Sequence, residues 1–478
     1  MSVFATMMFF GIRSMPKRPI IGIRREDKNA WERRTPLVPK DVRRLVHRGI
    51  SVWVESSSKR AFSDSEFEDA GAQIKKTLKG CPVIFGVKEI PVKNLEHGKT
   101  YIFFSHTVKG QPGGMPLLKR LLDLKCQLID YEKVVGDNGR RLIFFGKFAG
   151  IAGMIDSLWA LGRRLQDEGI SSPFTVIKPA HQYASLDEAL EEIFWAGKLI
   201  EKDGLPEEIT PFVCGFSGRG NVSRGAQIVF NELPVEILTE DSLAEGRVPR
   251  SKKKVYKWVF SLNHLMQPSA REREFSYNDY HQHPEKYRGA LAGHLPKFTI
   301  FMNGIFWNPR YPRLITRDML KRLYRSPENP RLRVIGDVTC DVNGSVECNV
   351  KSTDSANPVY VYNPRTGKAR DGIRGKGPVV MAVDNLPCEL PRESSAEFSS
   401  YLYPFVAEIA KANFGRKLDK TGLSPTIRRA VVVQGGRLTH DFDYLSKFIL
   451  QKRRPVTKPR PDQAQSRPNR RKPALERK

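Results

Sequence analysis

A glycine-rich turn near the middle of the chain has the residue types that hold the pyrophosphate of a dinucleotide. The apolar stretch 212–216 leads into this turn, and a segment of helical composition, 227–232, follows it. Glycines at such positions allow a tight turn and a close approach of the backbone to phosphate, and the amides that open the helix face the anion. The cofactor-binding residues predicted here are Gly218, Gly220, Asn221, Val222 and Ser223.

The turn departs from the GxGxxG pattern in two respects. Ser223 stands where the third glycine is usual, and no clear acidic partner for a ribose follows about 20 residues later. Such a glycine-rich segment can also be a turn without a ligand, so the rest of the chain must show whether a dinucleotide binds here. Lys252-Lys253-Lys254 could neutralise a 2′-phosphate, although a run of lysines is more often a solvated loop.

A candidate proton-transfer pair follows two apolar stretches in the first 145 residues. Lys88 comes directly after 83–87, and His106 comes shortly after 101–104. Open α/β sheets bind their ligands at the carboxyl ends of strands. Histidine titrates near neutral pH, and burial or neighbouring cations lower the pKa of a lysine. We therefore expect Lys88 and His106 to be the catalytic residues, with His106 the stronger candidate.

Arginine pairs in two short loops supply anchors for carboxylates. Arg34 and Arg141 carry planar guanidinium groups, which bind a carboxylate through two parallel hydrogen bonds. Glu89 and Glu132 follow strand candidates and could receive ammonium groups. Each of these residues alone could be an ordinary solvated side chain, but together they suit a substrate with several carboxylates and an amine.

Strands that alternate with helices must position these residues. In the first 145 residues, strand candidates alternate with helices such as 39–47 and 117–124, which indicates a mostly parallel sheet. The strand candidates are 20–23, 51–55, 83–87, 100–104 and 127–131. The glycine- and alanine-rich stretch 146–154 leads into a helix over 155–166, which passes towards the second domain.

A second α/β unit follows the glycine turn, with strands at 334–338 and 379–383. A helix over 395–413 then precedes a last strand at 430–433. The predicted fold is α/β, with two Rossmann-like domains, a central cleft and a C-terminal segment that returns to the first domain. The predicted divisions are a presequence at 1–18, a substrate domain at 19–149 and 392–451, a dinucleotide-binding domain at 150–391 and a disordered basic tail at 452–478.

Composition narrows the class of protein and its partners. The chain has 478 residues and a formal charge of +28, with no apolar run long enough to span a membrane. Six scattered cysteines without CxxC pairs indicate free thiols in a reducing compartment. His281-Gln282-His283 lacks further ligands in metal-binding spacing, so no metal site is expected. The proline-rich basic tail favours a solubilising extension over a nucleic-acid arm, and nucleic acid is disfavoured as a partner.

Several long segments resemble lysine-ketoglutarate reductase, the N-terminal half of the bifunctional aminoadipic semialdehyde synthase, in collinear order from about Pro19 to about Lys452. The chain is also similar to lysine-forming saccharopine dehydrogenase and, more distantly, to the alanine dehydrogenase and transhydrogenase fold. The segments that carry the resemblance are 24–37, 103–109, 145–154, 220–227 and 383–387.

The resemblance implies a reaction and roles for particular residues. L-Lysine, 2-oxoglutarate and NADPH would give saccharopine, water and NADP, with NADH not excluded. Residues matching Lys88 and His106 form the acid–base pair of the related saccharopine dehydrogenases, and those matching Arg34, Arg141 and Phe145 line the oxoacid site. Asp384 matches a position near the nicotinamide. Asp337 is counted with the cofactor-binding residues, either behind the site or as a turn former at a strand end.

Alternative interpretations remain open from the sequence. A monofunctional lysine-ketoglutarate reductase is expected, because the chain ends where the second half of the bifunctional enzyme would begin. The alternatives are a saccharopine dehydrogenase that works in the lysine-forming direction, and a non-catalytic basic scaffold or nucleic-acid-binding protein on the same fold. The acid-free N-terminus suits a mitochondrial presequence, which favours the matrix over the cytoplasm. A homo-oligomer is compatible with all these interpretations.

Overall fold

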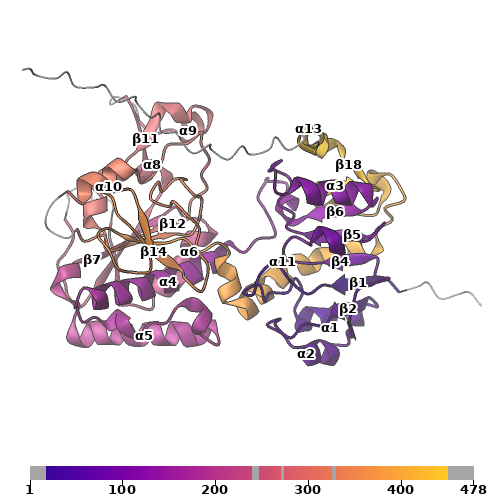
Figure 1. Cartoon of the computed structure of the whole chain (residues 1–478), viewed down its shortest axis with the longest axis horizontal. Helices are drawn as coiled ribbons and strands as arrows, with labels where there is room; N and C mark the ends of the chain where they lie inside the picture. The colour runs from indigo at the N-terminus through magenta and orange to yellow at the C-terminus, as the bar shows by residue number, and fades with distance from the viewer. Residues whose placement is uncertain (1–17, 240–246, 271–273, 326–329, 450–478) are drawn as a thin grey trace, which may run out of the picture.

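The computed structural model describes residues 18–239, 247–270, 274–325 and 330–449. They form two lobes that lie side by side, each built on an eight-stranded sheet (Figure 1). The predicted presequence, apart from Arg18, and the predicted basic tail lie outside the described residues. A small hairpin of β10 (Met266–Pro268) and β11 (Tyr287–Gly289) projects from the second lobe.

The sheet of the first lobe has the order β18-β17-β6-β5-β4-β1-β2-β3. Its parallel strands are β1 (Ile20–Ile23), β2 (Ser51–Glu55), β3 (Gln73–Lys75), β4 (Val83–Phe85), β5 (Thr100–Phe103) and β6 (Gln127–Asp130). β17 (Val431–Gln434) pairs antiparallel with β6, and β18 (Arg437–Leu438) pairs antiparallel with β17. The return of the C-terminal segment to the first lobe is therefore confirmed.

Helices cover this sheet and extend its core. They are α1 (Pro39–His47), α2 (Asp64–Asp69), α3 (Met115–Asp123), α11 (Pro391–Lys411), α12 (Pro425–Arg428) and α13 (Ser446–Ile449). In α11, Phe398, Leu402, Val406 and Ile409 are buried in the core of the first lobe. Their spacing places them on one stripe of a helix, so α11 carries the chain from the lobe boundary into this core (Figure 1).

The sheet of the second lobe has the order β15-β14-β16-β13-β12-β7-β9-β8. Its strands are β7 (Phe212–Ser217), β8 (Val235–Ile237), β9 (Val255–Phe260), β12 (Ile300–Asn303), β13 (Val334–Asp337), β14 (Val359–Tyr362), β15 (Ala369–Asp371) and β16 (Val379–Met381). β14 pairs antiparallel with both β16 and β15, and the other pairings described in this sheet are parallel. Cys214 and Phe216 belong to one apolar cluster and Val213 to another, so both faces of this sheet are covered.

The helices of the second lobe are α4 (Gly146–Asp167), α5 (Leu186–Asp203), α6 (Asn221–Phe230), α8 (Leu262–Leu265), α9 (Tyr277–Gln282) and α10 (Arg317–Leu323). The sequence predicted that the first of these starts at 155, which is wrong, because the stretch 146–154 is already helical. Its glycines let two backbones touch. A Cβ on Gly150 would lie 1.9 Å from the carbonyl oxygen of Val222, and one on Gly225 would lie 2.0 Å from that of Lys147.

Two further features limit the chemistry of the described chain. None of its helices combines the length and the apolar character that crossing a bilayer requires. All six cysteines are free thiols, and only Cys340 is partly exposed.

Candidate active site

A buried ion pair of the first lobe bonds to the segment that crosses between the two lobes. Arg34 donates through Nε to Glu32 Oε1 at 2.8 Å and through Nη2 to Glu32 Oε2 at 2.6 Å. Asn385, on the segment that crosses between the lobes, accepts from Arg34 at 2.7 Å and donates to Glu32 at 2.9 Å. Burial alone would raise the pKa of Glu32, but the adjacent Arg34 outweighs it and holds that pKa at about 2. The pair is therefore ionised at neutral pH.

Arg34 also lies over an aromatic stack. Its guanidinium carbon is 4.2 Å from the ring centroid of Phe145, and Phe145 stacks on Phe398 at 4.4 Å. Nη1 of Arg34 makes no hydrogen bond to any described residue, whereas its other donors are engaged. Arg34 thus has Nη1 left for a ligand, while its bond to Asn385 links the first lobe to the crossing segment.

Lys88 follows β4 and lies above a buried carboxyl group. The backbone amides of Val87 and Lys88 donate to the two oxygens of Glu26 at 2.8 and 3.0 Å. Burial lowers the pKa of the Lys88 ammonium group, and the nearby cations Arg34 and Lys28 lower it further. That ammonium group makes no hydrogen bond or ion pair with the described residues. A lysine of this kind loses its proton more readily than an exposed one, as a proton acceptor requires.

His106 follows β5, the strand next to β4, in an unusual backbone conformation. Its φ is +51°, a left-handed value that few side chains adopt without support from their surroundings. Nδ1 bonds to Glu89 Oε1, and the other carboxylate oxygen of Glu89 lies 3.3 Å from Lys28 Nζ. Burial alone would raise the pKa of Glu89, but His106 and Lys28 outweigh it and lower that pKa to about 2. A charged Glu89 requires the proton on Nδ1, which leaves Nε2 to exchange protons with a ligand.

Arg141 and Glu132 lie at the end of β6. Arg141 Nη2 is 3.6 Å from Glu132 Oε1, and 45% of the Arg141 side chain is exposed. The guanidinium group is thus accessible to a carboxylate, in contrast to the almost fully buried Arg34. Beside them Asp130, whose pKa burial raises to about 6, accepts from the Ser105 hydroxyl and from the Glu132 amide at 2.8 Å.

The glycine turn has the geometry of a dinucleotide site. Gly218 has φ +77°, and its amide donates to the carbonyl oxygen of Phe260 at 2.9 Å. A Cβ on Gly220 would meet no atom within 4 Å, so the backbone there is open to a pyrophosphate. Asn221 opens α6 and is exposed. Ser223 is buried, and its hydroxyl accepts a hydrogen bond from Gln227 at 3.1 Å.

The turn lies directly beside the anchors of the first lobe. A Cβ on Gly146, the residue after Phe145, would lie 3.5 Å from Asn221 Cβ and 3.6 Å from Val222 Cγ2. The aromatic ring under Arg34 and the start of α6 are therefore separated by one residue of α4. A ligand held by Arg34 and Arg141 would face a cofactor held by the glycine turn.

The two predicted aspartates occupy different positions. Asp337 is fully buried, and its oxygens accept from Asn303 and Asn349, each at 2.8 Å, and from Thr339 at 2.6 Å. It thereby ties the ends of β12 and β13 together from behind the turn. Asp384 is exposed next to Asn385. Contact of either residue with a cofactor stays a prediction.

The strand order places the ribose end of the site where the sequence did not suggest it. β9, and not β8, lies next to β7, so the residues that follow Phe260 take the position of the usual ribose partner. These include Ser261, Asn263 and His264, and none of the three is acidic. Lys252–254 precede β9 and lie at the opposite edge of the sheet, about 20 Å away along six residues. The suggestion that they neutralise a 2′-phosphate is wrong.

Several residues of the site carried no recognisable signal in the sequence. Glu32 and Asn385 are more than 350 positions apart, and only the return of the chain from the second lobe brings them together. The burial of Glu26 could not be predicted from the sequence either, because a glutamate between charged residues is usually exposed to solvent. A buried glutamate within the segment Trp31-Glu32-Arg33-Arg34 could have been suspected only from its place between two arginines and a tryptophan.

Substitution of Gly220 separates cofactor binding from folding. We expect Gly220→Val to weaken binding of the nicotinamide dinucleotide tenfold or more while the melting temperature stays unchanged, because φ is −79° and the added side chain would point into open space. Isothermal titration calorimetry and thermal unfolding measure the two quantities. Gly293→Val, at another open glycine of this lobe, should change neither. Unaltered affinity of the Gly220 variant for the dinucleotide would remove the turn from the site.

Two Rossmann-like lobes, with a glycine turn at the carboxyl edge of the second sheet, define a protein of the two-domain dinucleotide-binding class. Residues 22–152 match the alanine dehydrogenase/PNT N-terminal domain, and residues 307–441 match the C-terminal domain of the same family. Together these matches cover more than half of the chain. The chain belongs to the alanine dehydrogenase/PNT family.

Individual relatives narrow this assignment. The chain is 36% identical to alpha-aminoadipic semialdehyde synthase, mitochondrial, of Mus musculus over 91% of this chain and 48% of that protein. It is 34% identical to alpha-aminoadipic semialdehyde synthase of Arabidopsis thaliana, over 90% of this chain and 41% of that protein. It is 27% identical to saccharopine dehydrogenase [NAD(+), L-lysine-forming] of Schizosaccharomyces pombe over 81% and 92%. The chain thus spans about half the length of the synthases that it matches.

Solved structures support the fold. L-Alanine dehydrogenase superimposes with a TM-score of 0.56 at 18% identity, covering 90% of this chain and 98% of that one. Transhydrogenase from Sinorhizobium meliloti gives 0.52 at 14% identity, covering 88% and 100%. At these identities the likeness concerns the fold alone.

Proposed function

We propose that the chain is a lysine-ketoglutarate reductase, which condenses L-lysine with 2-oxoglutarate and reduces the resulting imine with NADPH to saccharopine. The observation that carries the proposal is the contact of Gly146 with Asn221 and Val222, which brings the carboxylate anchors next to the glycine turn. The similarity to the synthases over nine tenths of this chain supports the same reaction. We assign residues 19–149 and 392–451 to the substrate domain and 150–391 to the dinucleotide-binding domain.

The chemistry needs two groups that exchange protons. The ε-ammonium group of lysine must lose a proton before its nitrogen attacks the keto carbon of 2-oxoglutarate, and Lys88, with its lowered pKa, accepts that proton. The resulting carbinolamine loses water when His106, held by Glu89, protonates its hydroxyl through Nε2. When bound, NADPH supplies a hydride to the imine carbon. The products are saccharopine, one water molecule and NADP.

Saccharopine carries three carboxylates, and the site carries matching cations. Arg141 is exposed enough to bind a carboxylate of 2-oxoglutarate with two hydrogen bonds. Arg34 offers Nη1 to the same substrate, and Phe145 packs beneath the guanidinium. Glu132 is the partner for an ammonium group of the substrate. Gly218, Gly220 and the amides of Asn221, Val222 and Ser223 would hold the pyrophosphate, with Asp384 near the nicotinamide.

Preference for NADPH over NADH is part of the proposal, because an acid that would bind a ribose hydroxyl is missing after β9. Ser261 caps α8, and aspartate is an equally good cap. We expect Ser261→Asp to lower the preference for NADPH over NADH tenfold or more, about 1.4 kcal/mol, by repelling the 2′-phosphate. The ratio of kcat/KM for the two cofactors measures this. Ser276→Asp, at the cap of α9, is the matched control, and equal ratios in both variants would contradict the assignment.

We further propose that the protein acts in mitochondria, as the name of the mouse relative states for that protein. A homo-oligomer is compatible with the proposal, and neither a membrane nor a nucleic acid takes part in the reaction. The lysine-forming direction is the alternative within the same site, favoured by the fungal relatives.

The oxidation of NADPH, followed by its absorbance with lysine and 2-oxoglutarate each omitted in turn, tests the function. Oxidation should require both substrates. Oxidation without lysine, or none with either NADPH or NADH, would refute the proposal. Faster turnover from saccharopine and the oxidised cofactor at neutral pH would favour the lysine-forming alternative.

A further inference from the structure

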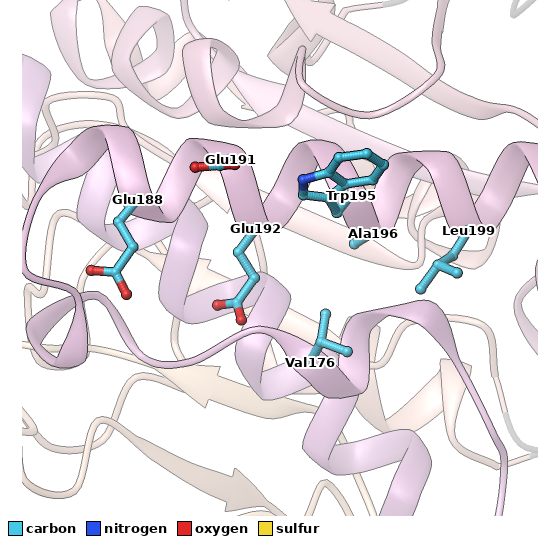
Figure 2. Close-up of a pocket in the computed structure, with 7 residues that line it drawn as sticks. All are labelled: Val176, Glu188, Glu191, Glu192, Trp195, Ala196 and Leu199. Carbon is cyan, nitrogen blue, oxygen red and sulfur yellow. The ribbon is translucent and has the colours of Figure 1, made fainter.

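A groove on the outer side of the second lobe has no part in the proposed reaction. It has a volume of about 340 Å³ and lies between α5 and the 3₁₀ turn Pro173–Val176. Trp195, Leu199 and Val176 supply its apolar surface and are 59%, 37% and 47% exposed. Figure 2 shows the tryptophan and leucine along α5, with Val176 facing the helix from the neighbouring segment. These three side chains therefore form one continuous apolar surface beside the acidic residues of α5.

Acidic side chains line the same groove. Glu188, Glu191 and Glu192 precede Trp195 on α5 and lie on the stripe that residues three and four apart share (Figure 2). Lys178 bonds to Glu188, and the Tyr183 hydroxyl bonds to Glu192. Glu191 is exposed and has no hydrogen-bond or ion-pair partner among the described residues. On a chain of formal charge +28, this groove is a concentration of negative charge around an indole ring.

The aromatic and acidic side chains of the groove indicate which kind of ligand it binds. Aromatic grooves bind proline-rich segments in the polyproline II conformation, carboxylates bind arginine, and an indole ring attracts a cation. A second copy of the same face would bring glutamates against glutamates, because a two-fold contact uses the same patch on both partners. Nucleic acid would be repelled. A basic, proline-rich peptide fits all three features.

This chain contains such a peptide. The segment Lys452–Lys478 has eleven lysines and arginines and five prolines against two acids, Asp462 and Glu476. It begins shortly after α13, and 27 residues in the polyproline II conformation span about 80 Å. A folded body of this size is about 60 Å across, so the segment is long enough to reach α5.

We propose that the groove of α5 binds the chain's own C-terminal segment, Lys452–Lys478. Prolines pack against Trp195 and Leu199, and lysine or arginine side chains bind Glu191 and its neighbours. The interaction is intramolecular and weakens as ionic strength rises, because much of it is electrostatic. It is independent of the proposed reaction and leaves the catalytic lobe untouched.

Two measurements on the full-length protein test this interaction. Zero-length carbodiimide cross-linking should join lysines of Lys452–Lys478 to Glu191 or Glu188, as located by mass spectrometry. Trypsin should cleave the segment at least tenfold faster in Trp195→Ala and Glu191→Lys than in the unaltered protein, and high salt should produce the same effect. Tyr277→Ala, at an exposed aromatic residue of α9, and Asp318→Lys, at an exposed acid of α10, are the matched controls and should change nothing.

Mixing isotopically labelled and unlabelled protein distinguishes the possible occupants. Cross-links within one chain support the proposal. Cross-links only between copies would assign the groove to another molecule's segment, and α5-to-α5 cross-links would assign it to a dimer interface. Either result overturns the proposal, as do cross-links that avoid α5 or cleavage rates that the α5 variants leave unchanged.

Discussion

His106→Gln is expected to lower kcat by about 10²–10⁴-fold, the usual contribution of a positioned acid or base, while the affinity for NADPH changes little. Glutamine keeps a polar side chain of similar length that can still bond to Glu89, but it cannot exchange a proton near neutral pH. His106 lies after β5 in the first lobe, whereas the glycine turn belongs to the second lobe, so cofactor binding does not depend on it. Steady-state kinetics and calorimetry with NADPH measure the two effects.

His97→Gln provides the matched control, because His97 is exposed in the same lobe. Its kinetics should equal those of the unaltered protein. Undiminished turnover in His106→Gln would remove this residue from the mechanism, and a parallel loss of NADPH affinity would indicate a structural role instead.

Removal of Glu32 is expected to destabilise the protein by about 3–5 kcal/mol, because Glu32→Ala leaves the buried Arg34 without its counter-ion. Activity should fall as well, because the Glu32 carboxylate holds Arg34 over Phe145. The same carboxylate also accepts a hydrogen bond from Asn385 on the crossing segment. Chemical denaturation measures the free energy of unfolding. The double variant Glu32→Ala/Arg34→Ala should lose less than the sum of the single variants, because it removes both buried charges.

The loss of folding stability caused by Glu32→Ala should depend on pH, and its direction follows from the pKa of Glu32. The pKa of Glu32 is about 2 in the folded state and is near 4.5 when unperturbed. Its ionised form therefore stabilises the fold above about pH 4.5, and that stability is lost as the pH falls towards 2. The difference in stability between Glu32→Ala and the unaltered protein should shrink over this range. Asp123→Ala, which breaks the exposed pair with Lys119, should cost about 1 kcal/mol or less, and an equally small cost for Glu32→Ala would contradict the account.

The sequence predicted those parts of the fold that local patterns determine. Alternating apolar strands and helices indicated two α/β units, and β17 at 431–434 was predicted within a residue of its position, whereas the short strand β18 after it was not predicted. The positions of the glycine turn, Lys88 and His106 after strands could be predicted because each follows an apolar stretch closely, while their roles stay predictions. Polar side chains at the carboxyl ends of parallel strands can be placed from the sequence, because each strand and the residues that follow it are adjacent in the chain.

Contacts between distant segments could not be predicted in this way. Glu32 and Asn385 meet only because β17 and α11 return to the first lobe, and no local pattern encodes that meeting. The position of β9 between β7 and β8 could not be predicted from the sequence either. It places Ser261 and its neighbours, and not Lys252–254, where the ribose of the cofactor is expected. The early start of α4 was missed because glycines usually weaken a helix, whereas here they allow backbone contact with α6.

Transfer of deuterium tests the central claim most directly. The protein is incubated with L-lysine, 2-oxoglutarate and NADPH carrying deuterium at the transferable position of the nicotinamide, and the products are analysed by mass spectrometry. The account predicts saccharopine with one deuterium on the carbon that was the keto carbon of 2-oxoglutarate. Saccharopine without deuterium, or a deuterated 2-hydroxy acid formed without lysine, would contradict it.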